Sequence, residues 1–385
     1  MRILVVTNLY PPQELGGYGR AMADFVWGLQ QRGHQLQVVT SEALYLGPGG
    51  MGPSGEPVDR RLQLKGSFEG GVKHLEDGAA RQRADQVNSQ LLRYWLQNSR
   101  WDGLLLGNLD LLGAELLPVL LEAGIPVLHH AGFVAPPYAP EQFPQSPNYQ
   151  LVAASRAVRE NLVAAGLPVM DAPVVYPGAR VELFGPAATG RPLPPLPDGS
   201  PGRPLRVCFA GLMMSSKGPH TLLEALALLR ERGVVVEAML AGGHFQADYV
   251  ARMQQFLQDI GLNPRVRFLP ALQRPQLARF FSLQHVCVFT SLYPEAFGIV
   301  AVEAMASGLA LVSSGVGGAA ESFESGESGL RYKPGDASDL AYQLQALVNQ
   351  PGLLKSLQVQ GRARVLEHFS VQRAVAQLEA LWMGT

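Results

Sequence analysis

The stretch LRVCFAGLMMSSKGPHTLLEALALLRERGVVVEAMLAGG, residues 205–243, indicates the fold of the second half of the chain. It opens with a short apolar run, 205–211, and ends with another, 235–243, each of the length expected for a buried strand. Between them, HTLLEALALLRERG, residues 220–233, is typical of a helix that stops at a glycine. A strand, a helix and a second strand in this order predict a parallel βαβ unit.

The same alternation continues on both sides of this stretch. After residue 243 the chain repeats helix-like and strand-like segments in YVARMQQFLQDIG, RVRFLP and HVCVFTS. The first half of the chain has the same pattern, in RILVVTN, RAMADFVWGLQQRG, QLQVVTS, WDGLLLGN, IPVLHHA and YQLVAAS. Each half is therefore predicted to be a parallel α/β domain.

A change of composition separates the two halves. Residues 185–204 contain seven prolines and four glycines, which is typical of a linker. We expect a first α/β domain over 1–184, a linker over 185–204 and a second α/β domain over 205–369, with a final helix over about 370–385 that returns to the first domain. Because open α/β sheets bind ligands at the carboxyl ends of their strands, the expected fold is two Rossmann-like domains facing a cleft.

Charge and composition exclude two classes of protein. The chain has 385 residues and a formal net charge of −1, so it lacks the basic surplus of a nucleic-acid-binding protein. Hydrophobic residues make up 47% and charged residues 16% of the chain, which argues for a folded rather than a disordered protein.

The two cysteines, Cys208 and Cys287, lie in strand-like apolar runs. A small buried hydrophobe is the simplest role for each, and a long chain with only two thiols is typical of an intracellular protein.

Neither a signal peptide nor a membrane span is indicated. The start MRILVVTNLY is too short for a signal sequence and fits a strand. The longest apolar stretch, 109–128, is interrupted by Glu115, Pro118 and Glu122. We expect a cytoplasmic protein, with peripheral contact at the cytoplasmic face of a membrane left open.

A glycine-containing loop follows the first predicted strand, in TNLYPPQELGGYGRAMADF, residues 7–25. It fails as a dinucleotide-binding fingerprint because Met22 stands where the third glycine belongs and because the loop is too long. Gly16 and Gly17 still allow the backbone to approach an anion or a sugar closely. A loop that needs glycine only for its own conformation is the alternative.

A lysine marks the turn after the strand at 205–211. The segment AGLMMSSKGPHTLLEA is no Walker A motif, because Ser216 replaces a glycine and Gly218 replaces a serine or threonine. Lys217 instead precedes a helix that starts with Pro219. A cation beside a helix N-terminus favours a bound phosphate group.

The stretch LYPEAFGIVAVEAMASG, residues 292–308, carries two glutamates. A helix that starts near residue 297 or 298 leaves Glu295 in the preceding loop and buries Glu303 on at least one side. A buried carboxylate needs hydrogen-bond donors, either from the protein or from a ligand such as a ribose diol. The amides of residues 297–299 would face whatever lies ahead of the helix.

Two carboxylates could also be the acid and base of a glycoside hydrolase. Their spacing does not exclude this role. Two α/β domains and a lysine at a phosphate-type turn fit it poorly.

Over nearly its whole length the chain resembles the retaining glycosyltransferases of family 4, which have the GT-B fold. The resemblance is carried by the Glu295–Glu303 spacing, E-x7-E, and by NLYPPQELGGYG, LQQRGHQLQVVTS, VVYPGARVELF, GLMMSSKG, PEAFGIVAVEAMASGLALVSSGVGG and ESGESGLRYKPGD.

The resemblance implies that the domain over 1–184 is on the acceptor side and that the domain over 205–369 binds the nucleotide sugar. It also implies a role for each matching residue. Glu295 and the amides that follow it would hold the donor sugar, Glu303 the nucleotide ribose, and Lys217 the diphosphate. The amides concerned are those of Phe297, Gly298 and Ile299. The loop at Gly16 and Gly17 would close over the diphosphate or sugar.

Two positions depart from the family pattern. Leu212 stands where the family often has an arginine that binds the diphosphate, so Lys217 would carry more of that contact. The family histidine near the donor sugar corresponds to His129 or His130, of which we choose His130; an ungapped match places Gly132 there, and a core histidine is an equally good interpretation.

The resemblance further implies transfer with retention and without a protein nucleophile, in which stabilisation of the departing diphosphate is the main catalytic term. We expect no cofactor and, since no D-x-D motif is present, no metal. The co-substrate would be a nucleotide-diphosphate sugar, first UDP- or GDP-linked, and the acceptor a small molecule, a glycan or a lipid-linked molecule.

Two alternatives remain from the sequence. One is another GT-B enzyme, such as an epimerase or a phosphorylase. The other is a nucleotide-sugar-binding protein whose activity has lapsed, for which Leu212 is the best argument and the retained Lys217, Glu295 and Glu303 are the counter-argument.

Overall fold

The computed structural model describes residues 1–185, 190, 194–243 and 246–384. The chain forms two compact units, Met1–Pro177 with Val371–Thr385, and Gly178–Ser370. The boundary thus falls after Pro177 and not after residue 184, because the segment from 178 belongs to the second unit. Ala179 there forms a β-bridge with Ser370.

The predicted linker lies within the second unit, and its residues 186–189 and 191–193 are outside the described part of the chain.

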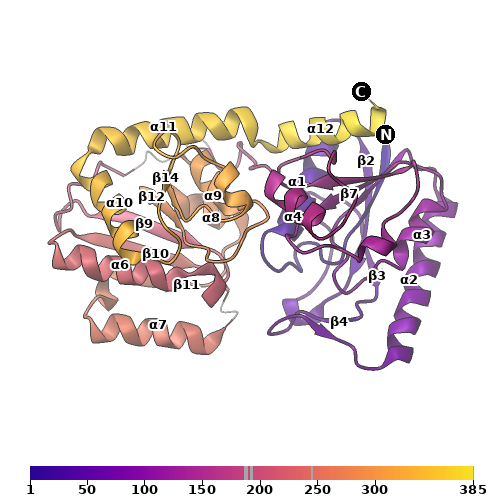
Figure 1. The fold of residues 1–385 in the computed structure, drawn as a ribbon, viewed down its shortest axis with the longest axis horizontal. Helices are drawn as coiled ribbons and strands as arrows, with labels where there is room; N and C mark the ends of the chain where they lie inside the picture. The colour runs from indigo at the N-terminus through magenta and orange to yellow at the C-terminus, as the bar shows by residue number, and fades with distance from the viewer. Residues whose placement is uncertain (186–189, 191–193, 244–245, 385) are drawn as a thin grey trace. The chain divides into compact units, whose positions relative to one another are not determined.

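The first unit is built on a parallel sheet of six strands in the order β3-β2-β1-β6-β7-β8 (Figure 1). These strands are β1 Arg2–Val6, β2 Gln35–Ser41, β3 Val58–Leu62, β6 Gly103–Leu106, β7 Val127–Ala131 and β8 Tyr149–Ala153, and a small antiparallel pair is formed by β4 Gly66–Ser67 and β5 Lys73–His74. The helices of this unit are α1 Tyr18–Gln31, α2 Gly78–Asn98, α3 Leu116–Leu121, α4 Arg156–Ala164 and α12 Val371–Met383.

The final helix, α12, packs on α1 in the first unit. Val371, Val375 and Leu378 join a buried cluster with Phe25 and Leu29 of α1. Apolar burial of this kind is the main stabilising term for a helix on a sheet face. The C-terminal segment is therefore part of the core of the first unit.

Polar contacts add to this packing of α12. The carboxylate of Glu379 lies 2.9 Å from Nε2 of His34 and also pairs with Arg32.

The second unit repeats this architecture with a parallel sheet in the order β11-β10-β9-β12-β13-β14. Its strands are β9 Leu205–Ala210, β10 Val236–Ala241, β11 Val266–Leu269, β12 Val286–Phe289, β13 Ala310–Ser313 and β14 Leu330–Arg331. Its helices are α6 Pro219–Glu231, α7 Ala247–Asp259, α8 Arg274–Phe281, α9 Ile299–Ala306, α10 Ala337–Asn349 and α11 Pro351–His368.

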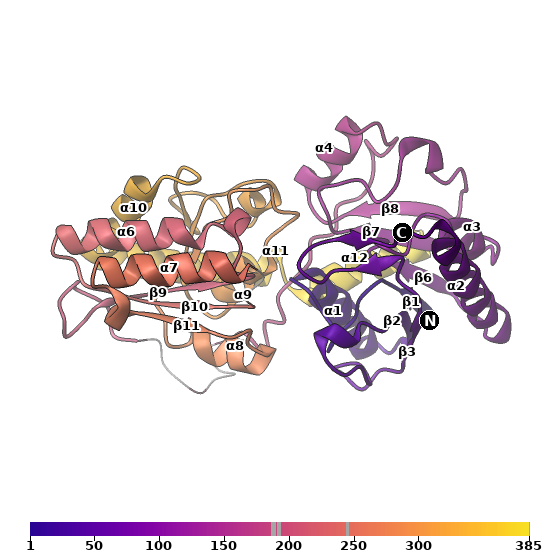
Figure 2. The same ribbon diagram turned by 90° about the horizontal axis from the view of Figure 1, so that it is seen from below.

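Helices cover both faces of the second sheet (Figure 2). Helices α6, α7 and α10 lie on one face, and α8, α9 and α11 lie on the other. This arrangement follows from right-handed crossovers, because the chain moves outward from β9 to β11 and then returns to β12 on the opposite side. Each half of the chain is thus a Rossmann-like α/β domain, as the alternation of segments predicted.

Cys208 and Cys287 are partners in the register of β9 and β12, and both are free and buried. Their role as small buried hydrophobes is confirmed.

The segment after Tyr45 is held by a buried carboxylate. Glu56 is fully buried, accepts a hydrogen bond of 2.5 Å from the hydroxyl of Tyr10, and accepts another of 2.9 Å from the amide of Ser54. The guanidinium of Arg60 donates to the carbonyl oxygens of Tyr10 and Pro11. These contacts fix the segment against the loop that precedes Gly16.

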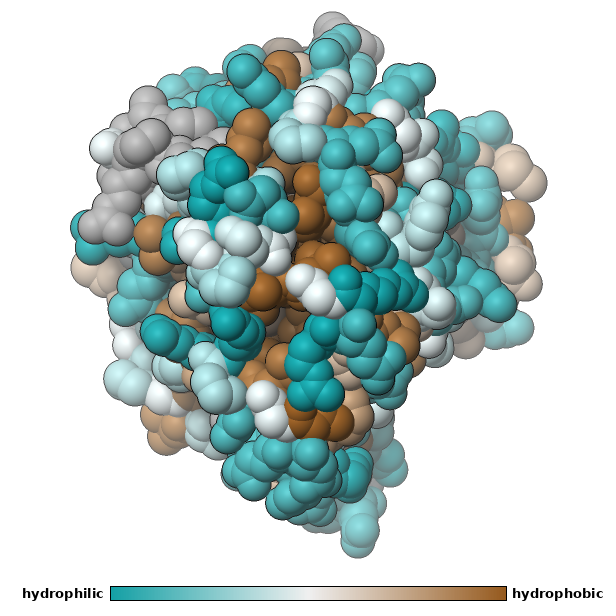
Figure 3. Space-filling view, turned by 90° about the vertical axis from the view of Figure 1, so that its left-hand side faces the viewer, coloured by the Kyte–Doolittle hydropathy of each residue, from teal (hydrophilic) through white to brown (hydrophobic). Residues whose placement is uncertain are grey.

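No helix in the described part of the chain is long and apolar enough to cross a membrane. The face drawn in Figure 3 is mostly hydrophilic, and apolar residues reach the surface mainly near its middle. Such a mixed surface is ordinary for a globular protein.

The packing of α12 on α1 gives a prediction at Gly28. A Cβ atom at this position would lie 2.8 Å and 2.9 Å from the side-chain methyl carbons of Val375 and Val371. Gly28→Ala should therefore destabilise the protein by ~1–3 kcal/mol through overpacking, despite the better helix propensity of alanine. The midpoint of thermal unfolding measures the effect.

Gly352→Ala is the matched control, because Gly352 also lies in a helix and a Cβ there meets nothing within 4 Å. An unfolding midpoint for Gly28→Ala at or above that of the wild type would contradict the close packing of α12.

Candidate functional site

The candidate site lies at the carboxyl edge of the second sheet. Strands β9, β12 and β13 are neighbours, so the loops that follow them emerge side by side. Backbone hydrogen bonds join two of these loops: the amide of Leu292 donates to the carbonyl of Ser216 over 2.8 Å. The hydroxyl of Thr290 also donates to the carbonyl of Lys217 over 2.7 Å.

Glycine is required at the turn that presents Lys217. Residues Ser215–Lys217 form one turn of 3-10 helix, and Gly218 then adopts φ 64° as the residue before α6. A Cβ at Gly218 would lie 2.4 Å from the carbonyl oxygen of Thr290. Only glycine satisfies both the left-handed backbone and this close approach. The turn places Lys217 beside the N-terminus of α6, as the sequence predicts.

Lys217 and Glu295 face each other across these two loops. Nζ of Lys217 donates to Oε1 of Glu295 over 2.6 Å, and the hydroxyl of Ser291 donates to the same oxygen. The side chains are 32% and 14% exposed. Lys217 is thus the more exposed partner, so its ammonium group is the part of the pair that a ligand can reach from solvent.

The backbone of Glu295 is fixed by the loop after β13. Its amide donates to the carbonyl of Val316 over 3.3 Å, and its carbonyl accepts from the amide of Gly318 over 2.7 Å. Gly317 has φ 62°, and a Cβ there would lie 2.6 Å from the carbonyl oxygen of Glu295. The glycines of SSGVGG, residues 313–318, thus hold Glu295 in place.

Helix α9 begins at Ile299, close to the predicted start. Gly298 precedes it with φ 97°, and Phe297 is buried with its ring 5.3 Å from that of Phe369. Because the first amides of a helix lack intrahelical acceptors, this end of α9 is a favourable place for ligand oxygens. The side chain of Phe297 packs inward, so any ligand contact there would be through backbone.

Glu303 is fully buried on α9, as its position in an apolar run predicts. The structure supplies a donor from the protein: NH2 of Arg274 lies 2.7 Å from Oε1 of Glu303. This guanidinium also lies 5.8 Å from the centre of the Phe184 ring.

Leu212, where the family often has arginine, is half-buried and brings no charge to this edge.

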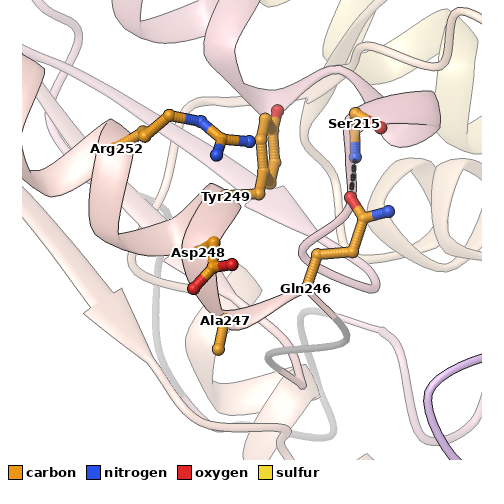
Figure 4. A pocket seen from close by; sticks show the side chains of 6 residues that line it. All are labelled: Ser215, Gln246, Ala247, Asp248, Tyr249 and Arg252. Carbon is orange, nitrogen blue, oxygen red and sulfur yellow. Dashed lines mark hydrogen bonds between the residues drawn. The ribbon is translucent and has the colours of Figure 1, made fainter.

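A pocket of about 420 Å³ lies next to the turn that carries Lys217 and is lined by Ser215, Gln246, Ala247, Asp248, Tyr249 and Arg252 (Figure 4). The amide of Ser215 donates to Oε1 of Gln246 over 2.9 Å.

The loop with Gly16 and Gly17 in the first unit leads directly into helix α1. Gly16 has φ 72°, and Gly17 is the residue before α1. Tyr18 then packs its ring over Gly132, where a Cβ would lie 1.7 Å from a ring carbon. The hydroxyl of Tyr18 donates to the carbonyl of His130 over 2.5 Å. The donor contact expected from Gly16 and Gly17 stays a prediction.

His130, which we expect near the donor sugar and count with Lys217 and Glu295 as a catalytic candidate, is held inside the first unit, and its role stays a prediction. Its side chain is fully buried, Nε2 lies 2.9 Å from the carbonyl oxygen of Val175, and Nδ1 lies 3.5 Å from the hydroxyl of Tyr18. Burial lowers the pKa of His130 to about 4 and that of His129 to about 3. Both rings are therefore neutral core groups, which is the alternative that the sequence left open.

Sequence reasoning missed Arg274, Ser291 and the backbone clamp at Gly317. The dipeptide Arg274-Pro275 does signal a helix start, but nothing in the sequence links it to a glutamate 29 positions later. In the described part of the chain, no group of three or more His, Cys, Asp or Glu side chains could hold a metal ion.

Comparison with solved structures identifies the fold. The whole chain aligns with a glycosyltransferase from Rickettsia africae ESF-5, covering 98% of that chain at a TM-score of 0.78 and 16% identity. It also aligns over its full length with all of Anabaena Alr3699/HepE in complex with UDP and glucose, at a TM-score of 0.74 and 20% identity. The two parallel sheets and these neighbours define a GT-B fold.

Most of the second unit is similar to a known protein family. Residues 197–364 match the model of the family described as glycosyl transferases group 1. This match over part of the second unit agrees with the resemblance found in the sequence.

Curated relatives agree with this assignment. A D-inositol 3-phosphate glycosyltransferase from Streptomyces bingchenggensis is 34% identical over 212 residues, which is 53% of this chain and 45% of the relative. A D-inositol 3-phosphate glycosyltransferase 1 from Catenulispora acidiphila is 31% identical over 244 residues, which is 60% of this chain and 56% of the relative. The chain spans about half the length of the curated relatives that it matches.

The buried histidines predict a pH dependence of stability. The unfolded chain binds protons at these histidines below about pH 6.5, whereas the folded protein does not until about pH 4 at His130 and about pH 3 at His129. Their contribution to stability is therefore complete above pH 6.5 and is lost as the pH falls toward the folded pKa values. From pH 6.5 to pH 5 each histidine should lower the free energy of unfolding by ~2 kcal/mol.

Urea unfolding at several pH values measures how the free energy of unfolding changes with pH. His130→Asn should be less stable at pH 7 yet lose less stability on acidification than the wild type. An equal slope in the two proteins would contradict the neutral, buried state of His130.

Proposed function

We propose that the protein is a retaining glycosyltransferase that moves a sugar from a nucleotide-diphosphate sugar to an acceptor hydroxyl. The observation that carries this proposal is the Lys217–Glu295 pair at the carboxyl edge of a group 1 glycosyl transferase domain. It combines a cation for phosphate with a carboxylate for sugar hydroxyls.

Lys217 is proposed to bind the diphosphate together with the N-terminus of α6. A phosphate oxygen is a stronger partner for the ammonium group than one carboxylate at a partly exposed position. The positive end of the helix dipole adds to the attraction. Because Leu212 brings no second cation, Lys217 should carry a large share of the diphosphate affinity.

Glu295 is proposed to accept hydrogen bonds from hydroxyls of the donor sugar. Once phosphate takes over Lys217, the Glu295 carboxylate keeps the hydroxyl of Ser291 and is open to a new donor. The amides of Phe297, Gly298 and Ile299 would add donors for donor-sugar oxygens. Glu303 is proposed to serve the ribose of the nucleotide.

The proposed reaction breaks the bond between the anomeric carbon and the diphosphate oxygen. The acceptor oxygen forms its new bond to that carbon on the same face, and its proton passes to the leaving diphosphate. No protein nucleophile or metal is part of this scheme, so stabilisation of the diphosphate by Lys217 and the helix end is the main catalytic term.

Names of similar proteins guide the choice of substrates. A structural neighbour is described with UDP and glucose, which makes UDP-glucose the first donor to test, before GDP-linked sugars. The curated relatives are named D-inositol 3-phosphate glycosyltransferases, which makes an inositol phosphate the first small-molecule acceptor to test, before glycans and lipid-linked acceptors.

A second candidate is a binding protein of the same fold that has lost transfer activity. Leu212 favours it, because the domain then lacks a charge that the family often uses on the diphosphate. Both candidates bind a nucleotide sugar. They differ because only the enzyme consumes the nucleotide sugar in the presence of an acceptor.

The proposed donor site predicts nucleotide binding that depends on Lys217 and Glu303. Calorimetry with UDP, GDP, ADP and their common sugar conjugates, with and without EDTA, should find one preferred nucleotide whose affinity survives chelation. Lys217→Ala and Glu303→Gln should each weaken it by ~10–100-fold, since charged hydrogen bonds contribute about 1.5–3 kcal/mol.

Lys355→Ala is the control, because Lys355 lies exposed on α11 of the same unit. Wild-type affinity in Lys217→Ala would remove Lys217 from the site. Consumption of the bound donor on addition of an acceptor, followed by the anomeric configuration of the product, separates the retaining enzyme from the binding protein.

A further inference from the structure

The ion pair between Arg274 and Glu303 joins two helices on one face of the second sheet. Arg274 opens α8 and Glu303 lies in the second turn of α9. NH2 of Arg274 is 2.7 Å from Oε1 of Glu303, and the two side chains are 16% and 0% exposed. Arg274 is thus the member of the pair that reaches the surface.

The position of Arg274 is fixed by its surroundings. Its guanidinium lies 5.8 Å from the centre of the Phe184 ring, and that ring lies 6.2 Å from Phe281 at the end of α8. A planar guanidinium held over an aromatic ring and against a carboxylate has little freedom to turn. The geometry is therefore present before any ligand binds.

The buried negative charge of Glu303 favours keeping the ion pair with Arg274 when a nucleotide binds. A ribose is neutral: its hydroxyls can donate hydrogen bonds to a carboxylate but cannot balance the charge. Displacement of Arg274 would take a charged partner away from this buried anion, which is strongly unfavourable. A ribose that reaches Glu303 must therefore bind beside Arg274 and not in its place.

We propose that Arg274 and Glu303 act together as the receptor for the ribose diol of the donor nucleotide. The inference rests on the proposed function, which assigns the ribose to Glu303, and it adds Arg274 as a second binding residue that determines specificity. A hydroxyl both donates and accepts, so one diol can donate to the carboxylate and accept from the guanidinium. A nucleotide that lacks one ribose hydroxyl leaves either the carboxylate of Glu303 or the guanidinium of Arg274 without its hydrogen-bond partner on the ribose.

The test is the discrimination between UDP and its 2′-deoxy and 3′-deoxy analogues, or the same series for GDP if the protein prefers guanine. Calorimetry on the full chain compares the wild type with Arg274→Lys, which keeps the charge and loses the planar fork, and with Arg274→Met. Arg279→Gln is the matched control, because Arg279 lies exposed on the same helix. Thermal unfolding shows which variants are folded.

The wild type should bind the ribonucleotide ~10-fold or more tightly than at least one deoxy analogue, as expected of a site built for a hydroxyl. In Arg274→Lys this ratio should fall to within ~3-fold, mainly through weaker ribonucleotide binding, while Arg279→Gln keeps the wild-type ratio. A role in folding alone would lower the unfolding temperature and leave the ratio unchanged.

Failure of this inference is distinct from failure of the proposed function. If the wild type binds the nucleotide but folded Arg274→Lys keeps the full ratio, Arg274 is no ribose ligand and the inference is overturned alone. If the folded wild type binds no nucleotide diphosphate of the panel, the proposed function falls and this inference falls with it. Arg274→Met, if folded, should agree with Arg274→Lys.

Discussion

The common carboxyl edge of the strands in the second sheet is the constraint on which the candidate site depends. In a parallel sheet every strand ends at the same edge, so segments far apart in the sequence meet there. Lys217 follows β9 and Glu295 follows β12, 78 positions later in the sequence. Nζ of Lys217 nevertheless lies 2.6 Å from Oε1 of Glu295. Gly218 and Gly317 permit the two close backbone approaches that hold these loops together. Small residues at the turns thus determine where the charged ones lie.

The two glutamates of the E-x7-E pattern differ in burial and in the stability of their ion pairs, which fits the different roles proposed for them. Glu295 is partly exposed and shares one oxygen between Lys217 and Ser291, so its bonds can be exchanged for bonds to a ligand. Glu303 is buried against Arg274, and its charge must stay paired whether or not a ligand is present. An adaptable pair suits a sugar and a diphosphate that change during a reaction, whereas a fixed pair suits a nucleoside that only has to be held.

Much of this could be predicted from the sequence, and the limits have physical causes. Local patterns gave the alternating strands and helices, the turn at Lys217 and the burial of Glu303, because each depends on neighbours within one turn. The partner of Glu303 could not be found, because Arg274 meets it only through the packing of α8 on α9. The burial of His130 could not be foreseen, since a motif near a strand end does not tell which way a ring points.

The carboxyl edge of the second sheet is the proposed binding site for a nucleotide-diphosphate sugar. A crystal structure of the protein with the nucleotide preferred in solution would show directly whether the nucleotide binds there. We expect density for the diphosphate beside Nζ of Lys217 at the N-terminus of α6, with the ribose at Arg274 and Glu303. Density for the nucleotide elsewhere, with the Lys217–Glu295 pair intact, would show that this edge is not the donor site.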